Sequence, residues 1–414
     1  MFIRLAIKSL LDRKGSVLVS LLAMSVSIFV LLGVEHIRHQ TKENFSNTVS
    51  GVDLIVGART GSVNLLLYSV FRVGNPTNNI RWDTYKKIAS SRKVHWAIPI
   101  SLGDSHKGYR VLGTSADYFR YFSYGDKRLL EFKEGRAFKD LFDVVLGAEV
   151  ARKLNYRVGD RLVLAHGMAS TSFSLHEDRP FDVVGILSPT GTPVDQTLHV
   201  SLAGIEAIHI DWQHGVKQPN SSTSIDDFDG VELQPESITA FMLGLKEKMA
   251  TFRVQRGINN YKGEPLLAIL PGVALSELWQ MMGVLEKTLL LVSVLVFLAA
   301  CLGVSAMLLA SIRERRKEIH LLRVIGAPPR FLFFLIQLEA FLITFLGVIL
   351  GLLLLMGCLL LSRDYLIETF GLHINISIFT SNSAYMIFMV FAASFIVAAL
   401  PSFVSYLRAS KGLD

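Results

Sequence analysis

Four long apolar runs dominate the pattern of hydrophobic and polar positions along the chain. They cover residues 16–34, 289–312, 331–361 and 384–406. A helix needs roughly 20 predominantly apolar residues to cross the hydrocarbon core of a bilayer. Each run approaches or exceeds that length, so the pattern predicts four transmembrane helices. The third run is the longest, which allows it to tilt or to extend beyond the bilayer.

Basic residues flank these runs unevenly and predict how the helices are oriented. Segments 1–15, 313–330 and 407–414 are rich in Lys and Arg, whereas the loop 362–383 contains only Arg363. Short basic segments stay on the cytoplasmic side of a membrane. We therefore expect both termini and segment 313–330 in the cytoplasm, and residues 35–288 outside it.

The first 15 residues form a predicted amphipathic helix. Phe2, Ile3 and Leu10 fall on one face, and Arg4 and Lys8 fall on the other. Such a helix lies in the membrane interface, with its apolar side toward the acyl chains. We expect this segment to contact membrane lipids at the cytoplasmic surface.

Residues 35–288 alternate strand-like and helix-like patterns, which predicts an α+β domain. Strands at 94–100 and 109–114 are expected to pair around a turn at Gly103-Asp104-Ser105. The two ends of the domain read as helices continuous with the neighbouring membrane spans. The predicted fold class is therefore a membrane α-helical protein with four transmembrane helices, carrying a large α+β extracytoplasmic domain on a helical stalk.

Composition supports the membrane class and excludes several functions. About half of the 414 residues are apolar, and the net charge of +7 is concentrated beside the apolar runs, which argues against nucleic acid as a partner. Both cysteines, Cys301 and Cys358, lie in apolar runs, so no disulfide framework is expected in the domain. No phosphate-binding loop, zinc-protease helix or nucleophile elbow is present, and we expect no catalytic activity in this chain.

The segment between the second and third spans carries a family resemblance. Residues 313–327 read RERRKEIHLLRVIGA, which is similar to the hallmark of MacB/LolC/FtsX-type ABC transporter permeases, the type VII or mechanotransmission superfamily. Four upstream pieces resemble the periplasmic core of that family: residues 134–138, 144–147, 159–160 and 181–187. The resemblance covers the whole chain in order. It departs from the family pattern in residues 400–414, which only approximate a proline-led basic segment.

This resemblance implies a permease subunit of the inner membrane with a periplasmic domain. It implies a cytoplasmic ABC ATPase as partner, which binds ATP and Mg²⁺, and a second permease copy or paralogue that completes a dimer. This chain itself would hold no cofactor. ATP hydrolysis would be coupled to motion of the periplasmic domain, which would act on a lipoprotein, a peptide or another periplasmic client.

Within the resemblance, segment 313–330 is the candidate ATPase-coupling element. Ile319 and Leu322 supply an apolar face among charged residues, and Gly326-Ala327 with two prolines ends the helix. The alternative is that its arginines only anchor to lipid headgroups. The candidate coupling residues are Arg313, Arg315, Arg316, Glu318, Ile319, Leu322, Arg323, Gly326 and Ala327.

The third span contains candidate packing residues. A carboxylate inside a membrane is costly, so Glu339 has either a functional role or a structural hydrogen bond to a neighbouring helix. Gly347 and Gly351 allow close helix packing, either within one chain or between two copies.

Nine of the eleven histidines lie in the expected extracytoplasmic region. His36 and His39 have an i,i+3 spacing that can hold a metal, so they are the candidate zinc ligands, although no third ligand is fixed by spacing. Scattered histidines are usually surface residues, so the alternative is that these histidines bind no metal.

Two other functions remain open from the sequence. One is a transmembrane regulatory scaffold that controls a periplasmic hydrolase or a zinc-handling protein without transporting a substrate. The other is a membrane sensor that works with no ATPase.

Overall fold

The computed structural model describes residues 2–167, 179–210, 212–213, 216–217, 233–314, 328–370 and 381–411. The chain divides into two compact units. The first, here called the bundle, comprises Met1–Thr41, Met282–Tyr365 and Ile374–Asp414; the second, here called the domain, comprises Lys42–Met281 and Leu366–His373.

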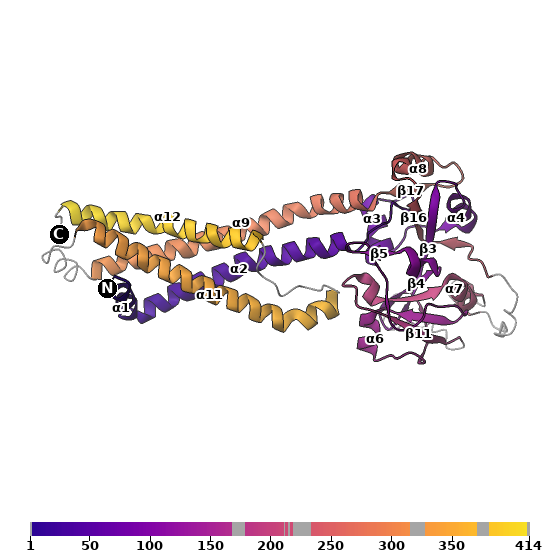
Figure 1. Ribbon diagram of the computed structural model, residues 1–414, viewed down its shortest axis with the longest axis horizontal. Helices are drawn as coiled ribbons and strands as arrows, with labels where there is room; N and C mark the ends of the chain where they lie inside the picture. The colour runs from indigo at the N-terminus through magenta and orange to yellow at the C-terminus, as the bar shows by residue number, and fades with distance from the viewer. Residues whose placement is uncertain are drawn as a thin grey trace. The chain divides into compact units, whose positions relative to one another are not determined.

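Among the described residues, five helices build the bundle or enter it. They are α1 (Phe2–Leu11), α2 (Lys14–Asn47), α9 (Pro271–Glu314), α11 (Pro329–Phe370) and α12 (Ser381–Lys411). Four of them are long and apolar enough to cross a membrane, as predicted. Both termini, the last turn of α9 and the first turn of α11 lie at the same end of the bundle (Figure 1).

The bundle core is formed by one apolar stripe from each long helix. Met24 and Ile28 of α2, Val304 of α9, Ile343 of α11 and Ala398 of α12 are all buried in it. The outward faces stay apolar as well, for example Leu291 and Phe388, which are 59% and 67% exposed. A helix that is apolar on all sides is expected in lipid.

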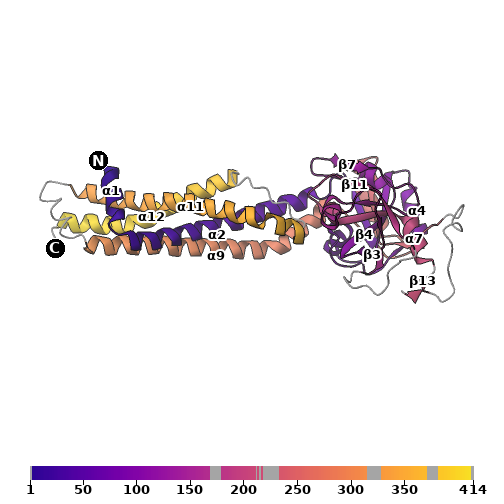
Figure 2. The same cartoon turned by 90° about the horizontal axis from the view of Figure 1, so that it is seen from below.

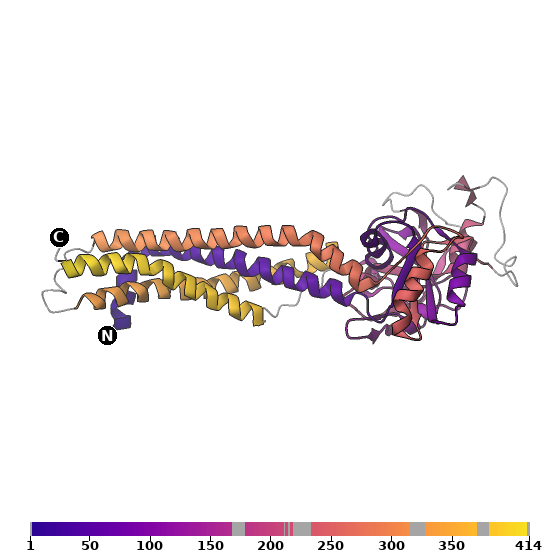
Figure 3. The same cartoon turned by 90° about the horizontal axis from the view of Figure 1, so that it is seen from above.

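Helices α2 and α9 run side by side through the bundle, which the three views show consistently (Figures 1, 2 and 3). The hydroxyl of Ser27 lies 3.5 Å from the carbonyl oxygen of Val296. Nearer their outer ends, Arg38 of α2 forms an ion pair with Glu286 of α9 at 3.6 Å. The sequence prediction that both spans continue outward as helices is confirmed, because each is a single unbroken element.

The domain is built on an 11-stranded mixed sheet. Its main path has the order β17-β1-β16-β3-β4-β12-β8-β11-β7, with β10 beside β3 and β9 beside β11. The strands are β1 (Leu54–Ala58), β3 (Val94–His106), β4 (Tyr109–Thr114), β7 (Phe132–Gly135), β8 (Asp143–Leu146), β9 (Arg161–Leu162), β10 (Ala165–His166), β11 (Phe181–Leu187), β12 (Thr197–Ser201), β16 (Ala240–Leu245) and β17 (Leu266–Ile269). Short two-residue strands form three small extra sheets: β2 (Ile80–Arg81) with β15 (Ser237–Ile238), β5 (Ser123–Tyr124) with β6 (Arg128–Leu129), and β13 (Trp212–Gln213) with β14 (Val216–Lys217).

Short helices complete the domain. They are α3 (Ser62–Leu66), which continues as a π-helical turn Leu67–Phe71, α4 (Trp82–Ala89), α5 (Asp117–Tyr121), α6 (Ala148–Leu154), α7 (Leu202–His209) and α8 (Thr251–Asn259), with 3₁₀ turns at Pro193–Gln196 and Lys248–Ala250. Helices α4 and α8 lie in one apolar cluster with β1, β16 and β17, whereas α6 and α7 lie in another with β8, β11 and β12. The domain is therefore α+β, as predicted.

Strand β3 joins the two halves of the sheet. Its first part pairs with β16 and its second part with β4, and the register shifts between Leu102 and Ser105. The predicted turn at Gly103-Asp104-Ser105 is therefore wrong. The chain turns instead at Lys107 and Gly108, whose φ angles of 47° and 87° are those of a tight two-residue hairpin.

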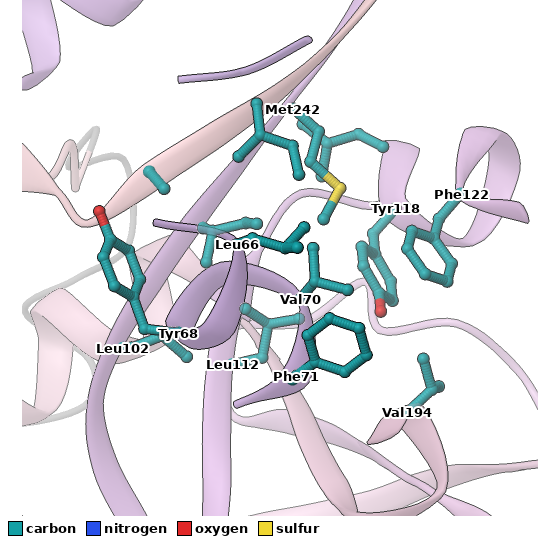
Figure 4. Close-up of a cluster of buried hydrophobic side chains, with 14 of the residues drawn as sticks. Leu66, Tyr68, Val70, Phe71, Leu102, Leu112, Tyr118, Phe122, Val194 and Met242 are labelled. Atoms are coloured by element: carbon teal, nitrogen blue, oxygen red, sulfur yellow. The ribbon is translucent and has the colours of Figure 1, made fainter. Parts of the chain in front are cut away.

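A third apolar cluster fills the space beside the centre of the sheet (Figure 4). Leu66, Tyr68, Val70 and Phe71 from α3 and its π-helical continuation pack there against side chains of the sheet and of α5. The sheet supplies Leu102, Leu112 and Met242, α5 supplies Tyr118, and the residue after α5 supplies Phe122. This core fixes the position of β3, which carries Asp104, one of the polar residues described below.

Candidate functional site

Helix α9 takes part in the cores of both units. Ala274, in its first turn, is buried in the central apolar cluster of the domain. Farther along the same helix, Phe297, Cys301 and Leu308 are buried in the core of the bundle. A single 44-residue helix is therefore fixed by packing at both of its ends.

Helix α2 has the same arrangement over 34 residues. Met24 and Leu31 are buried in the bundle, and Phe45 packs on the domain core, where its ring lies 5.7 Å from Trp279 of α9. The two helices therefore contact each other inside each unit.

A buried polar cluster joins the N-terminal helix to α11. The Ser9 hydroxyl donates to the Glu339 carboxylate, and Arg13 forms an ion pair with the same carboxylate at 3.4 Å. The Arg13 guanidinium also donates to Ser9 at 3.0 Å. The side chains of Arg13 and Glu339 are only 12% and 4% exposed. Glu339 thus forms a structural bond to a neighbouring segment, which is one of the two roles that the sequence left open.

Gly347 and Gly351 lie where α11 meets α2. A Cβ atom at Gly347 would stand 2.7 Å from Cγ of Met24, and one at Gly351 would stand 3.0 Å from the carbonyl oxygen of Ser25. A side chain at either position would require atoms of α2 to shift. The structure therefore contains the packing contact within one chain.

The candidate coupling segment lies largely outside the described residues. Arg313 is exposed in the last turn of α9, and residues 315–327 are not described. The remaining coupling residues therefore stay sequence predictions: Arg315, Arg316, Glu318, Ile319, Leu322, Arg323, Gly326 and Ala327. The structure does describe Glu314, immediately before these residues. Glu314 lines a groove of about 720 Å³ together with Ser16, Ser20, Ala306 and Ala310.

In the domain, three metal-binding side chains converge at one edge of β3. The Oδ1 atom of Asp104 lies 3.2 Å from Nδ1 of His166 and 3.2 Å from Nε2 of His209. The two ring nitrogens are 3.3 Å apart. Asp104 is buried, whereas the imidazoles of His166 and His209 are 48% and 27% exposed.

The local fold explains why these three side chains meet. Strand β10 pairs antiparallel with β3 in a register that sets His166 directly opposite Asp104. His209 is the last residue of α7, a helix that follows β12 and packs near β4. Side chains opposite each other on antiparallel strands lie on the same face, so the strand pair and the helix end deliver three groups to one point.

Electrostatics keep the carboxylate ionised. Burial opposes the charge of Asp104, but the hydrogen bonds to His166 and His209 outweigh burial and lower the pKa of Asp104 to about 2. The hydrogen bond to Asp104 raises the pKa of His166 above its ordinary value, although burial acts in the opposite direction.

Sequence reasoning missed this cluster and named His36 and His39 instead. Both lie on α2, and His36 is buried. Among the described residues, the group of three potential ligands whose donor atoms converge is Asp104, His166 and His209, and neither α2 histidine belongs to it. Only the pairing of β3 with β10 brings Asp104 and His166 together, and a two-residue strand such as β10 leaves a weak sequence signal.

Comparison with known proteins gives two family matches. Residues 16–242, more than half of the chain, match the MacB-like periplasmic core domain, and residues 290–412 match the FtsX-like permease C-terminal family. A comparison with curated proteins gave no significant match.

Solved structures with similarity to this chain include two domains from bacterial transporters. The periplasmic region of MacB from Actinobacillus actinomycetemcomitans is 12% identical, with a TM-score of 0.35, over 56% of this chain and 94% of that one. The extracellular domain of the noncanonic ABC-type transporter YknZ from Gram-positive bacteria is also 12% identical, with a TM-score of 0.31, over 53% of this chain and 98% of that one. The two family matches carry the assignment, and with the four apolar helices they identify the chain as a member of the MacB/FtsX-type family of ABC transporter permeases.

Proposed function

We propose that this permease couples ATP hydrolysis by a partner ATPase in the cytoplasm to movement of its periplasmic domain. The observation that carries the proposal is the continuity of α9, which is buried in the domain core at Ala274 and in the bundle core at Leu308. A movement imposed on one end of such a helix displaces the groups packed around the other end.

Helix geometry supports this transmission. With a rise of 1.5 Å per residue, the 44 residues of α9 span about 66 Å and the 34 residues of α2 about 51 Å. No proline interrupts either helix after its first residue. A helix with its hydrogen-bond ladder intact moves as a rigid body, so tilt or rotation is passed along it instead of being absorbed at a kink.

The ATPase would engage segment 313–330, which joins the last turn of α9 to the first turn of α11. Both termini share this end of the bundle, which agrees with the distribution of basic residues that predicts a cytoplasmic location (Figure 1). ATP and Mg²⁺ would be bound by the ATPase, and this chain would supply no catalytic group. A second copy or a paralogue would complete the transporter.

The periplasmic domain would be the part that acts on the client, which we propose to be a lipoprotein, a peptide or another periplasmic molecule. Coupling through helices moves the domain without requiring a substrate to pass between the spans. The exposed apolar faces of the bundle would contact lipid and the second permease copy.

Co-purification of the ATPase tests this proposal. The full chain would be isolated in mild detergent from its native membrane, as wild type and as the variants Glu318→Ala and Arg323→Ala, and its partners identified by mass spectrometry. Arg253→Ala is the matched control, because Arg253 is an exposed arginine on α8 in the domain. We expect an ABC ATPase at equal stoichiometry with the wild type and the control, and its loss from the two coupling variants.

Two results would contradict the proposal. Recovery of the chain without any ATPase, under conditions that preserve a known ABC complex, would favour a membrane sensor. Retention of the ATPase by both coupling variants would remove segment 313–330 from the docking surface. If the ATPase is present but is stimulated only by a periplasmic protein, the permease acts as a regulatory scaffold and not as a transporter.

A further inference from the structure

We propose that Asp104, His166 and His209 form a binding site for a divalent transition-metal ion, with Zn²⁺ as the best fit, on the periplasmic domain. Its three ligands belong to β3, β10 and α7 and not to the helices that carry the proposed coupling, and its test needs no ATPase.

The spacing of the three donor atoms matches tetrahedral zinc. Bonds of about 2.0–2.1 Å from zinc to nitrogen or oxygen place the ligand atoms of a tetrahedron about 3.3–3.4 Å apart. The three separations among Asp104 Oδ1, His166 Nδ1 and His209 Nε2 are 3.2, 3.2 and 3.3 Å. An ion slightly out of the plane of this nearly equilateral triangle reaches all three atoms with little side-chain movement.

Hydrogen bonding alone cannot make all three contacts favourable. If both ring nitrogens carry protons, each can donate to Asp104, but the contact of 3.3 Å between the two nitrogens is then not a hydrogen bond. If one nitrogen is unprotonated, its lone pair faces the ionised carboxylate at 3.2 Å. A cation at the centre accepts a lone pair from each atom and removes the conflict.

The chemistry of the donor set selects the ion. Imidazole nitrogen suits zinc, copper, iron and nickel, whereas Ca²⁺ and Mg²⁺ prefer a shell made of oxygen atoms. Two imidazoles and one carboxylate are a set that zinc uses with three protein ligands. A magnesium or calcium site is therefore disfavoured by two of the three ligands.

Negative charge around the three ligands also favours a cation. Glu206 lies one turn before His209 on α7 and interacts electrostatically with both His209 and Asp104. His209 itself is at the C-terminus of α7, where the helix dipole presents its negative end.

Exposure and rigidity indicate an exchangeable ion. The backbone of Asp104 is held in the sheet by the pairing with β10, while the two imidazoles reach solvent. An ion can therefore arrive without unfolding of the domain. Once bound, it would connect helix α7 to the paired strands β3 and β10.

Zinc titration of the purified full chain tests the site. The chain would be stripped with a chelator, titrated with Zn²⁺ against a chromogenic competitor, and its bound metal counted by mass spectrometry. His166→Ala and His209→Ala remove single ligands. His95→Ala is the matched control, because His95 is exposed on the same strand β3. Asp104→Asn is informative only if tryptophan fluorescence shows a folded domain, because Asp104 is buried.

We expect one zinc ion per chain in the wild type and in the control. Loss of a metal's outer-shell partner already costs 10–100-fold in affinity, so loss of a ligand should weaken zinc binding at least about 100-fold. Excess Mg²⁺ should not displace the ion, and X-ray absorption should show nitrogen and oxygen ligands at about 2.0–2.1 Å. The proposal would be overturned if His166→Ala and His209→Ala bound zinc as tightly as the wild type. It would also be overturned if the wild type held no zinc against the competitor, and the three residues would then be a hydrogen-bonded triad.

Discussion

The bundle and the domain each bury a carboxylate, and they neutralise it in different ways. In the bundle, Glu339 is bound by Arg13, whose guanidinium has donors only and cannot ligate a metal. In the domain, Asp104 is bound by two histidines, whose neutral rings are good metal ligands. The two carboxylates are similarly buried but differ in role. Glu339 links a terminal segment permanently to a membrane helix, whereas Asp104 belongs to a site that can accept an ion.

The bundle and the domain also differ in the contacts that hold each of them together. The bundle contains close contacts of small residues, such as Gly347 and Gly351 against α2. The domain is held by a mixed sheet whose polar positions include the buried histidines His106 and His199. We therefore expect the bundle to respond to changes of shape and the domain to respond to pH and metal ions.

The largest expected effect is in the bundle. Arg13→Ala removes the ion-pair partner of the buried Glu339 carboxylate, and breaking a buried ion pair from one side costs about 3–5 kcal/mol. We expect a corresponding loss of unfolding free energy, measured by detergent-induced denaturation. The double variant Arg13→Ala with Glu339→Gln should recover part of it, since the buried charge is then gone. A single variant as stable as the wild type would show that the pair is dispensable.

The next effect concerns the domain and pH. Burial lowers the pKa of His199 to about 3, and its ring lies against the rings of Tyr118 and Phe119. In the unfolded chain a histidine has a pKa near 6.5. Below that pH, His199 therefore binds a proton in the unfolded chain but stays neutral in the folded domain. Unfolding free energy should therefore fall by up to about 1.4 kcal/mol for each pH unit between roughly pH 6.5 and 3.

Tryptophan fluorescence measures this pH effect, because all four tryptophans lie between residues 82 and 279. His199→Phe keeps an aromatic ring in the core but cannot titrate, so its stability should decline less steeply over the same range. Parallel pH profiles for the wild type and His199→Phe would contradict the assignment.

A smaller effect is expected where α11 meets α2. Gly351→Ala places a Cβ against Ser25 and Ile28, and overpacking of this kind typically costs about 1–3 kcal/mol. Gly357→Ala on the same helix is the matched control, because its Cβ would meet no atom within 4 Å. Thermal unfolding in detergent should separate the two variants. Equal midpoints would mean that α2 and α11 can move apart at no cost.

The smallest effect is expected at the ion pair between α2 and α9. Glu286→Gln removes one partner of Arg38, whose side chain is 35% exposed and also binds Glu35. Partly exposed pairs contribute at most about 1 kcal/mol and weaken with salt. The difference from wild type should be small at low ionic strength and vanish at high ionic strength. A loss that persists in high salt would indicate packing and not charge.

The helices were predictable because their signals are local. A run of 20 apolar residues and the helical pattern that follows it can be read within a single segment, so the four spans and the continuity of α9 were predicted correctly. The turn between β3 and β4 was not predicted correctly, because Gly103 and Gly108 are equally plausible turn residues in the sequence. Only the structure shows that Gly108, and not Gly103, adopts a positive φ.

The polar sites were predicted poorly because their members are far apart in the chain. Glu339 was recognised as unusual, but its partner Arg13 lies 326 residues away. Asp104 and His166 are 62 residues apart, and His166 and His209 are 43 apart. The sequence indicated His36 and His39 because the spacing of ligands within one helix can be recognised in a sequence, whereas contacts between distant segments cannot.

Nucleotide-dependent movement of the domain tests the proposed coupling most directly. Spin labels would be placed at Met249 in the domain and Leu361 on α11, which are 97% and 88% exposed, with Cys301 and Cys358 replaced. Their distance distribution would be measured in the complex with the ATPase, without nucleotide and after trapping with ADP and vanadate. Val284→Pro interrupts α9 at an exposed position, and Val284→Ala preserves the helix.

We predict that trapping shifts the distribution in the wild type and in Val284→Ala, and that Val284→Pro abolishes the shift while the ATPase stays bound. An unchanged distribution in the wild type, or a full shift in Val284→Pro, would contradict transmission through α9.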